Sequence, residues 1–201
     1  GQVELLTFGL ESFDQDLFDL CYSNYGGGAT ARIPCDTLRK ALRRKDVRAD
    51  VLVDARHFPD PEAQMLTRHT GHHHEIIARL VGHRNFRTWL NSVKADFLWA
   101  KGGGADGDLP LAIAVYCRAG KHRSVAGAIV LRHIFEEEGW ECPAPRHLSQ
   151  PRWSRSCCKG NCQECKNPPP SYYEVLDSAY DMWRSVPGSW SSSGGQHRRQ
   201  R

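Results

Sequence analysis

The strongest constraint on the fold is an apolar segment that runs into a helical segment through a polar turn. Residues 111–116 are continuously apolar and predict a buried strand, and residues 125–137 carry the periodicity of a helix. The turn between them holds one glycine, three cationic or titratable side chains and a hydroxyl: Gly120, Lys121, His122, Arg123 and Ser124. Such a turn directs backbone N–H groups and the positive end of the helix dipole at one place. The sequence therefore predicts an anion site whose shape suits a phosphate.

The same turn also permits a catalytic interpretation, because Cys117, Arg123 and Ser124 fit the pattern Cys-x-x-Gly-x-x-Arg-Ser. This pattern resembles the phosphate-binding loop of cysteine-dependent phosphatases. There a thiolate attacks phosphorus while the loop amides and the arginine hold the phosphate oxygens, and the helix N-terminus favours the thiolate. Two departures count against this interpretation. Tyr116 stands where those enzymes usually carry histidine, and no Trp-Pro-Asp-like acid loop lies upstream.

A nucleotide-binding P-loop is excluded more firmly. That loop needs Ser or Thr after its Gly-Lys pair and a glycine at its first position. Here His122 follows Gly120-Lys121, and Val115 stands at the position of the first glycine.

Other short blocks accompany this loop along the chain. Residues 54–61 read Asp-x-Arg-x-x-Pro-x-Pro, Thr70-Gly71 follows, residues 120–125 read Gly-Lys-His-Arg-Ser-Val, and Arg146-His147 comes last. Together they resemble the C-terminal domain of the bacterial RapZ proteins, and residues 6–9 resemble its opening strand, which ends in Ser-Phe-Gly. The resemblance covers about residues 3–150. It is interrupted between Gly9 and Ala49 by residues that the family lacks.

The resemblance implies an α/β domain related to sugar-phosphate-binding folds, with a mainly parallel sheet and flanking helices. In that family the domain binds an amino-sugar phosphate and takes part in small-RNA recognition. The N-terminal half of the bacterial proteins, with its Walker loop, is not part of these 201 residues. We therefore expect no ATP- or GTP-linked role to transfer.

Carried over residue by residue, the resemblance also implies a ligand pocket. In it Lys121 and Arg123 would neutralise phosphate charge, the Gly120 region would supply backbone donors, and Asp54 with Arg56 would contact the rest of the ligand. Arg118-Ala119 stands where the family has Thr-Gly or a similar pair, which bears on sugar specificity. The full predicted set is Asp54, Arg56, Cys117, Gly120, Lys121, His122, Arg123 and Ser124.

Composition suggests further partners. The net charge is +4, and Lys and Arg cluster at residues 39–45, at residues 146–155 and at the chain's end, so RNA is a candidate partner. A solvated helix face and a disordered tail explain the same charges without RNA. No apolar run approaches 18 residues and no signal-peptide pattern is visible, so we expect no membrane partner and a cytoplasmic location.

The pattern of segments predicts one RapZ-C-like α/β domain at residues 1–150, with an insertion at about residues 10–48. A Cys-rich segment and a helix follow at residues 151–189, and residues 190–201 are expected to be disordered. Helices are predicted at residues 11–22, 36–44 and 75–100, the last divided at Gly82. The helix at residues 172–186 is expected to pack on the core or on a second copy of the chain, which would make a homo-oligomer.

Five of the eight cysteines crowd the C-terminal part of the sequence. Cys157, Cys158, Cys162 and Cys165 have the spacing of a compact zinc knuckle, to be completed by Cys142 or His147. Disulfides and an unstructured thiol-rich linker are the alternatives to a structural zinc ion. Cys21 and Cys35 are expected to be buried or half-buried. No cofactor is predicted for the main site.

Histidines also gather near the Thr-Gly block: His69, His72, His73, His74 and, beside them, Glu75. Consecutive histidines at the start of a helix cannot all face one ion, so we interpret the cluster as the polar entry to a helix rather than as a metal site. A supporting role in phosphate binding, through His69 or His72, is the second interpretation.

These patterns favour a domain that binds or senses a phosphorylated small ligand, most simply a sugar phosphate, with RNA as a further candidate partner. A cysteine-dependent phosphatase with Cys117 as nucleophile and Arg123 as the phosphate-holding side chain is the alternative.

Overall fold

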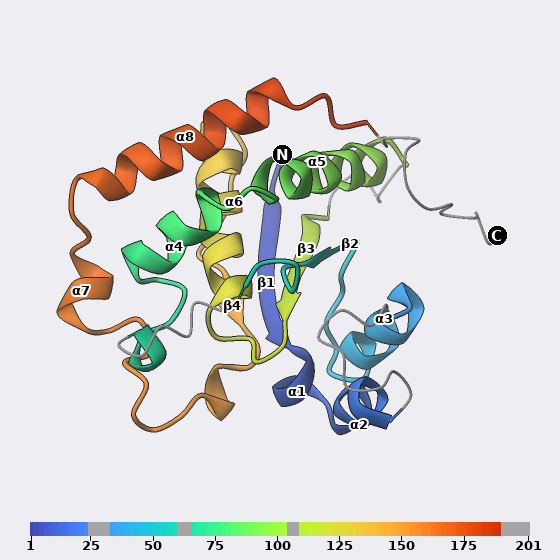
Figure 1. The fold of residues 1–201 in the computed structure, drawn as a ribbon. Helices are drawn as coiled ribbons and strands as arrows, with labels where there is room; N and C mark the ends of the chain where they lie inside the picture. The colour runs from blue at the N-terminus through green and yellow to red at the C-terminus, as the bar shows by residue number, and fades with distance from the viewer. Residues whose placement is uncertain (24–32, 60–65, 104–108, 190–201) are drawn as a thin grey trace.

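The computed structural model describes residues 1–23, 33–59, 66–103 and 109–189, and it is α/β in architecture. At its centre lies a four-stranded sheet in the order β2-β3-β1-β4, with every strand pairing parallel (Figure 1). The strands are β1 (Val3–Gly9), β2 (Val51–Asp54), β3 (Leu111–Cys117) and β4 (Arg146–His147). The predicted fold class, a mainly parallel sheet with flanking helices, is confirmed.

Helices connect and cover these strands, because parallel neighbours need crossover connections. The helices of the described residues are α1 (Leu10–Phe13), α2 (Gln15–Ser23), α3 (Cys35–Arg43), α4 (His74–Val81), α5 (Phe86–Gly102), α6 (Arg123–Glu137), α7 (Gln163–Lys166) and α8 (Ser171–Ser185). The division of the long helical pattern near Gly82 is confirmed, since α4 ends at Val81 and α5 begins at Phe86.

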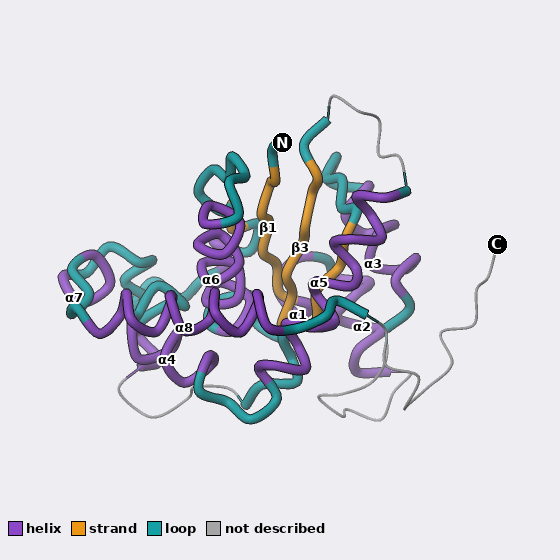
Figure 2. Tube along the Cα trace, turned by 90° about the horizontal axis from the view of Figure 1, so that it is seen from above, coloured by secondary structure: helices purple, strands orange, loops and turns teal. Residues whose placement is uncertain are grey.

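The sheet is buried on both faces, which explains the apolar character of its central strand. All residues of β3 are buried. One face, including Leu5 and Ile113, packs against α4, α5, α6 and α8. The other face, including Leu6 and Ala114, packs against α1, α2 and α3, which come from the residues expected as an insertion. Helices therefore lie on both sides of β1 and β3 (Figure 2).

The C-terminal extension returns to the core. Helix α8 packs against α4, α5 and α6 (Figure 1), and the Trp183 ring lies 5.7 Å from the Phe135 ring between centroids. Trp183 is 1% exposed, so this helix is part of the main hydrophobic core. Packing on the core is one of the two arrangements expected for the helix. The predicted disordered tail lies outside the described residues.

Two local predictions were wrong, those for the helix at residues 11–22 and for Cys35, and one short strand was missed. The helix expected at residues 11–22 is broken at Asp14, whose backbone is extended and whose carboxylate accepts hydrogen bonds from the amides of Asp16 and Leu17. Strand β4 was not expected, because two residues carry no periodicity. Cys35 is exposed at the start of α3, and the side chain of Cys21 lies outside what the structure describes.

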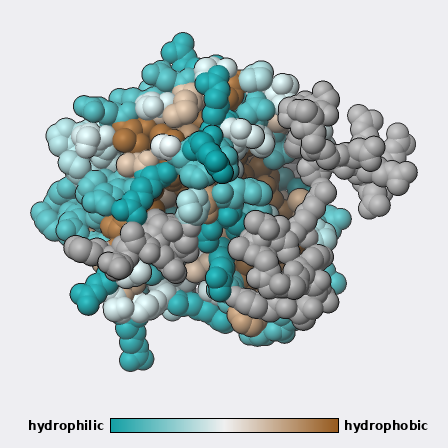
Figure 3. Space-filling model, viewed as in Figure 1, coloured by the Kyte–Doolittle hydropathy of each residue, from teal (hydrophilic) through white to brown (hydrophobic). Residues whose placement is uncertain are grey.

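The face of the molecule seen in Figure 3 is largely hydrophilic, with hydrophobic side chains in small patches. Large apolar side chains that reach the surface of the described residues are Leu98, Trp99, Leu109 and Tyr173. Among the described residues, no helix has both the length and the apolar character needed to cross a membrane.

Substitutions near the two ends of α8 should differ in their effect on the free energy of unfolding. We expect Trp183→Ala to lower the free energy of unfolding by about 3–5 kcal/mol, because it opens a cavity among buried aromatic rings. Urea unfolding followed by circular dichroism measures this loss. Tyr173→Ala, on the same helix and 59% exposed, is the matched control and should change it by about 0.5 kcal/mol or less. Equal losses in both variants would mean that α8 does not pack on the core as described.

Candidate functional site

The carboxyl ends of the strands meet at one edge of the sheet, because all strands run parallel. Gly9, which ends β1, lies opposite Cys117, which ends β3, and Asp54 at the end of β2 lies opposite Tyr116. This is the edge at which open α/β sheets bind ligands. The structure therefore brings Asp54 and Cys117 to the same edge, although they are far apart in the sequence.

Hydrogen bonds to the carbonyl oxygens of the loop between β3 and α6 anchor this loop to other parts of the chain. Each of the first four carbonyls accepts a hydrogen bond from a group outside the loop, over 2.9–3.1 Å. The pairs are Glu11 N to Arg118 O, Ser12 Oγ to Ala119 O, Trp153 Nε1 to Gly120 O and Gly71 N to Lys121 O. The next carbonyl, of His122, accepts from Ala126 N within the start of α6.

This anchoring sets the direction of the amides. In a trans peptide the N–H points away from the C=O, so carbonyls fixed outward turn the following amides to the inner side of the loop. The amide of Gly120 shows this direction, since it donates to Cys117 Sγ over 3.2 Å. Helix α6, 15 residues long, begins at Arg123 and adds the positive end of its dipole. The loop is therefore built as a concave set of donors.

Close backbone contacts require glycine at three positions around the loop. Gly120 has a φ of +71°, and a Cβ there would lie 2.4 Å from Gly9 N. A Cβ on Gly9 would lie 2.3 Å from the carbonyl carbon of Ala119, and one on Gly71 would lie 2.3 Å from Ala126 N. The Thr-Gly block is thus explained by packing: Gly71 lets residues 66–71 approach the start of α6.

Cys117 is buried beneath the loop. Its thiol is 3.2 Å from both the Gly120 amide and Ser124 Oγ, and its residue is 2% exposed within the main hydrophobic core. Ser124 is fully buried. The two residues therefore form the floor of the loop.

The cationic side chains of the loop reach in different directions. Lys121 Nζ donates to Thr67 O over 2.7 Å, and His122 Nε2 donates to His69 O over 3.1 Å. Arg123 is 7% exposed and donates to Phe58 O over 2.9 Å. These bonds tie the loop to residues 56–58 on one side and to residues 67–69 on the other.

Asp54 and Arg56 form an ion pair, with Arg56 Nη2 2.6 Å from Asp54 Oδ2. The guanidinium of Arg56 also lies 5.6 Å above the Tyr116 ring, and burial, followed by Asp54, raises the pKa of Tyr116. Asp54 and Arg56 line a cavity of about 690 Å³ along β2, between α3 and α5. Residues 117–124 do not line this cavity, so the predicted pocket residues divide into a loop group and a β2 group.

The half-buried carboxyl of Asp96 lies in the wall of the same cavity. Burial raises the pKa of Asp96 to about 6, although Arg39 opposes the shift.

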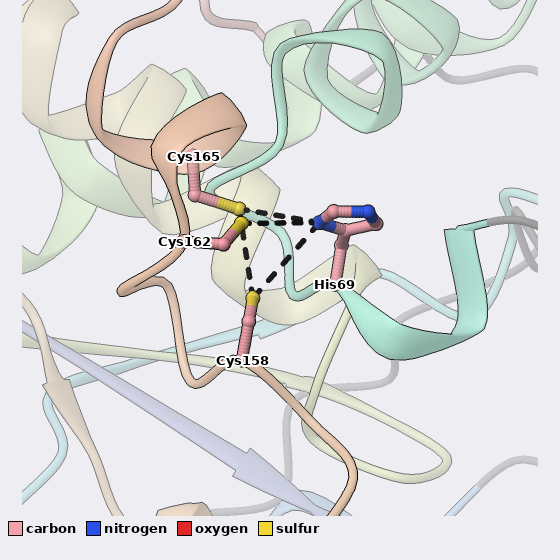
Figure 4. A group of neighbouring side chains, drawn as sticks. All are labelled: His69, Cys158, Cys162 and Cys165. Atoms are coloured by element: carbon pink, nitrogen blue, oxygen red, sulfur yellow. Dashed lines mark hydrogen bonds between the residues drawn. The ribbon is translucent and has the colours of Figure 1, made fainter.

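A second cluster joins the C-terminal extension to residues 66–71 (Figure 4). His69 Nδ1 faces three thiols, at 3.9 Å from Cys158 Sγ, 3.4 Å from Cys162 Sγ and 3.7 Å from Cys165 Sγ. Cys158 Sγ and Cys165 Sγ lie 3.8 Å apart. These four residues could hold a metal ion.

The membership of this cluster differs from the predicted metal-ligand set. Cys157 does not join it, because its side chain is buried beside Val125 and Trp153, where its sulfur accepts from Lys159 N. Cys142 is buried in the main core, and His147 is bonded to Thr7. The place assigned to Cys157 is taken by His69, which lies 89 positions before Cys158 and could not be found from cysteine spacing.

The neighbouring histidines make further contacts of their own, although the His73 ring lies 4.3 Å from the His69 ring between centroids. His73 caps α4 by accepting from Glu75 N, and His72 contacts Thr70 Oγ1 over 2.7 Å. His147, at the end of β4, contacts Thr7 Oγ1 over 2.9 Å, and its ring lies 5.1 Å from that of His72. Burial, and then His72, lower the pKa of His147 to about 4.

This shift predicts a pH-dependent stability. Because the folded pKa of His147 lies below the usual 6.5, the unfolded chain binds the proton more tightly between pH 4 and 6.5. The free energy of unfolding should therefore rise with pH across this window, by about 3 kcal/mol from His147. His147→Gln should flatten the slope, leaving the part that arises from His72, whose pKa burial also lowers. An unchanged slope in the variant would contradict the assignment.

Comparison with known proteins agrees with the family resemblance of the short sequence motifs. The family model of the RapZ C-terminal domain matches residues 42–150, which is more than half of the chain. The matched residues include Asp54, Arg56, His69, Gly71 and the loop, whereas β1 and the three cysteines of the cluster lie outside them. A search of curated proteins found no match. The chain belongs to the RapZ C-terminal domain family.

Proposed function

We propose that the domain binds the phosphoryl group of a small phosphorylated ligand in the loop between β3 and α6. The observation that carries this proposal is the set of outward hydrogen bonds on the carbonyls of residues 118–121. They turn the loop amides inward at the start of a helix, which is the arrangement that binds phosphate in proteins. Family membership agrees with a sugar-phosphate-sensing or adapter role.

Lys121 and Arg123 supply the charge in this proposal. Lys121 is half-buried, and its flexible side chain can move from Thr67 O to a phosphate oxygen. Arg123 is held more rigidly by its bond to Phe58 O. A guanidinium has five N–H donors, so a bond to a carbonyl does not exhaust it.

A sugar phosphate, and among these an amino-sugar phosphate, fits the neighbouring groups best. Arg123 Nη1 lies 3.4 Å from Arg56 O, so the backbone of Arg56 lies beside the loop, while the Asp54–Arg56 ion pair lines the cavity along β2. The Asp54 carboxylate suits a ligand amine or hydroxyl, and Arg56 suits an oxygen acceptor. Arg118 and Ala119 are the positions at which the sugar preference of this chain would depart from that of its family.

The phosphatase alternative is favoured by one observation and opposed by another. Hydrogen bonds from the Gly120 amide and contact with Ser124 Oγ are what a reactive thiolate would need. The exposed fraction of Cys117 is only 2%, however, and a nucleophile must reach the phosphorus atom. We therefore favour binding over hydrolysis.

The basic residues near α3 give less support to RNA binding. Arg44 pairs with Asp14 and Asp16, and Arg39 donates to Asp50 O. Part of the predicted positive patch is thus neutralised within the chain. RNA binding rests on the family alone.

Phosphorus NMR tests the proposal. We expect the signal of an amino-sugar phosphate to shift on addition of the protein and to stay constant over hours. Lys121→Gln should weaken the affinity roughly tenfold or more, because a charged hydrogen bond to phosphate is lost. Lys40→Gln, which removes an exposed lysine on α3, is the matched control and should bind like the unmodified chain.

Two results would contradict the proposal. Equal affinity of the Lys121→Gln and unmodified proteins would remove the loop as the site. A growing inorganic-phosphate signal that is lost in Cys117→Ser would instead establish the phosphatase.

A further inference from the structure

We infer that His69, Cys158, Cys162 and Cys165 form a structural zinc site that fixes the C-terminal extension to the segment behind the phosphate loop. The three thiols come from one short turn, and the imidazole comes from the other side of the interface (Figure 4). Three cysteines and one histidine are a ligand set that structural zinc sites use.

The distances between the ligand atoms agree with a tetrahedral ion. With Zn–S bonds of about 2.3 Å and Zn–N bonds of about 2.0–2.1 Å, two sulfurs lie about 3.8 Å apart and a sulfur lies about 3.6 Å from a nitrogen. The Cys158–Cys165 sulfur distance is 3.8 Å, and the three sulfur–nitrogen distances are 3.4–3.9 Å. The side chains are thus spaced for one zinc ion at their centre.

The orientation of His69 supports the same conclusion. Its Nε2 lies 3.2 Å from Glu164 Oε2, on the side of the ring opposite the thiols. A proton on Nε2 donated to this carboxylate leaves the Nδ1 lone pair directed at the three sulfurs. Histidines that bind zinc commonly hold their second nitrogen in this way.

The segment that carries the three cysteines has few buried side chains to hold its conformation. Of residues 154–170, all described by the structure, only Cys157 is buried. The turn between Cys158 and Cys162 also contains two residues with positive φ, Lys159 at 52° and Gly160 at 80°. A segment with such a small apolar core needs a cross-link to hold one conformation.

A disulfide is the competing cross-link and explains less. It would join two of the thiols at about 2.05 Å and leave the third without a role. It would also give no reason for an imidazole nitrogen to lie within 3.9 Å of all three sulfurs. A second group, His69, His73 and Glu164, involves the Nε2 side of the same ring and lacks the thiolates that zinc prefers.

The zinc site shares its backbone with the phosphate loop. Lys121 Nζ donates a hydrogen bond to Thr67 O, and His122 Nε2 donates one to His69 O. In the other direction, the Gly71 amide donates to Lys121 O. Arg68 O, between these positions, accepts from Cys158 N over 2.9 Å. Loss of zinc should therefore loosen the support of the loop. This coupling rests on the proposed function, whereas the zinc site does not.

Metal analysis tests the zinc site. The full chain, prepared under reducing conditions, should contain one zinc ion per chain by mass spectrometry. Cobalt should bind in its place with the intense visible absorption of tetrahedral thiolate coordination. Cys162→Ser should lower the affinity for cobalt at least tenfold, while Cys157→Ser, the matched control, should leave it unchanged. Glu164→Gln should weaken it by about 10–100-fold without abolishing the tetrahedral spectrum.

Two results would overturn the zinc site. One is a Cys157→Ser variant that loses metal as completely as Cys162→Ser. The other is a folded chain, checked by circular dichroism, that binds no cobalt under reducing conditions.

The coupling is tested by titrating inorganic phosphate into the zinc-loaded chain and into the Cys162→Ser variant. We expect binding to be several-fold weaker in the variant and exchange of the Gly71 amide hydrogen to be faster. Equal phosphate affinity in both would overturn the coupling alone. Absence of phosphate binding in both, while the unmodified chain holds its zinc ion, would overturn the proposed function and leave the zinc site standing.

Discussion

The hydrogen bonds on the carbonyls of residues 118–121 are the constraint on which the rest of the site depends. Left to itself, a loop of this length would expose its carbonyls and amides equally and would attract cations and anions alike. Four donors from three separate parts of the chain fix the carbonyls outward. The amides and the start of α6 therefore form the inner surface of the loop. Under the proposed function, selectivity for an anion would thus be a property of the whole fold rather than of the loop sequence.

This arrangement explains the placement of distant segments. The start of α1 holds the first half of the loop, the Thr-Gly block holds its second half, and Trp153 from the C-terminal side holds Gly120. The parallel sheet brings these segments to one edge, because each strand delivers its carboxyl end there. The cysteine cluster then closes the far side of residues 66–71. The proposed phosphate binding and the proposed thiol coordination would therefore share one stretch of backbone.

Local patterns predicted the parts of this structure that local physics determines. The strand before the loop was predicted from a continuous apolar run, the helix after it from its periodicity, and the division of the helices from Gly82. The helix break at Asp14 was a local feature that the pattern missed, whereas the cysteine–histidine cluster depends on contacts between distant residues. The zinc-ligand prediction chose Cys157 because it is adjacent in sequence, whereas folding brings His69 to the cluster from 89 positions away. The role of Trp153 likewise carries no signal in the sequence, since any buried tryptophan would look the same.

The inward direction of the loop amides is the central claim, and nitrogen–proton correlation NMR during titration with an amino-sugar phosphate tests it most directly. The account predicts that the amide signals of residues 119–123 move most, and that the same sugar without its phosphate leaves them in place. The opposite result would contradict the account: the largest shifts would come from residues that line the cavity along β2, such as Trp89 and Ser92, and the loop amide signals would not move.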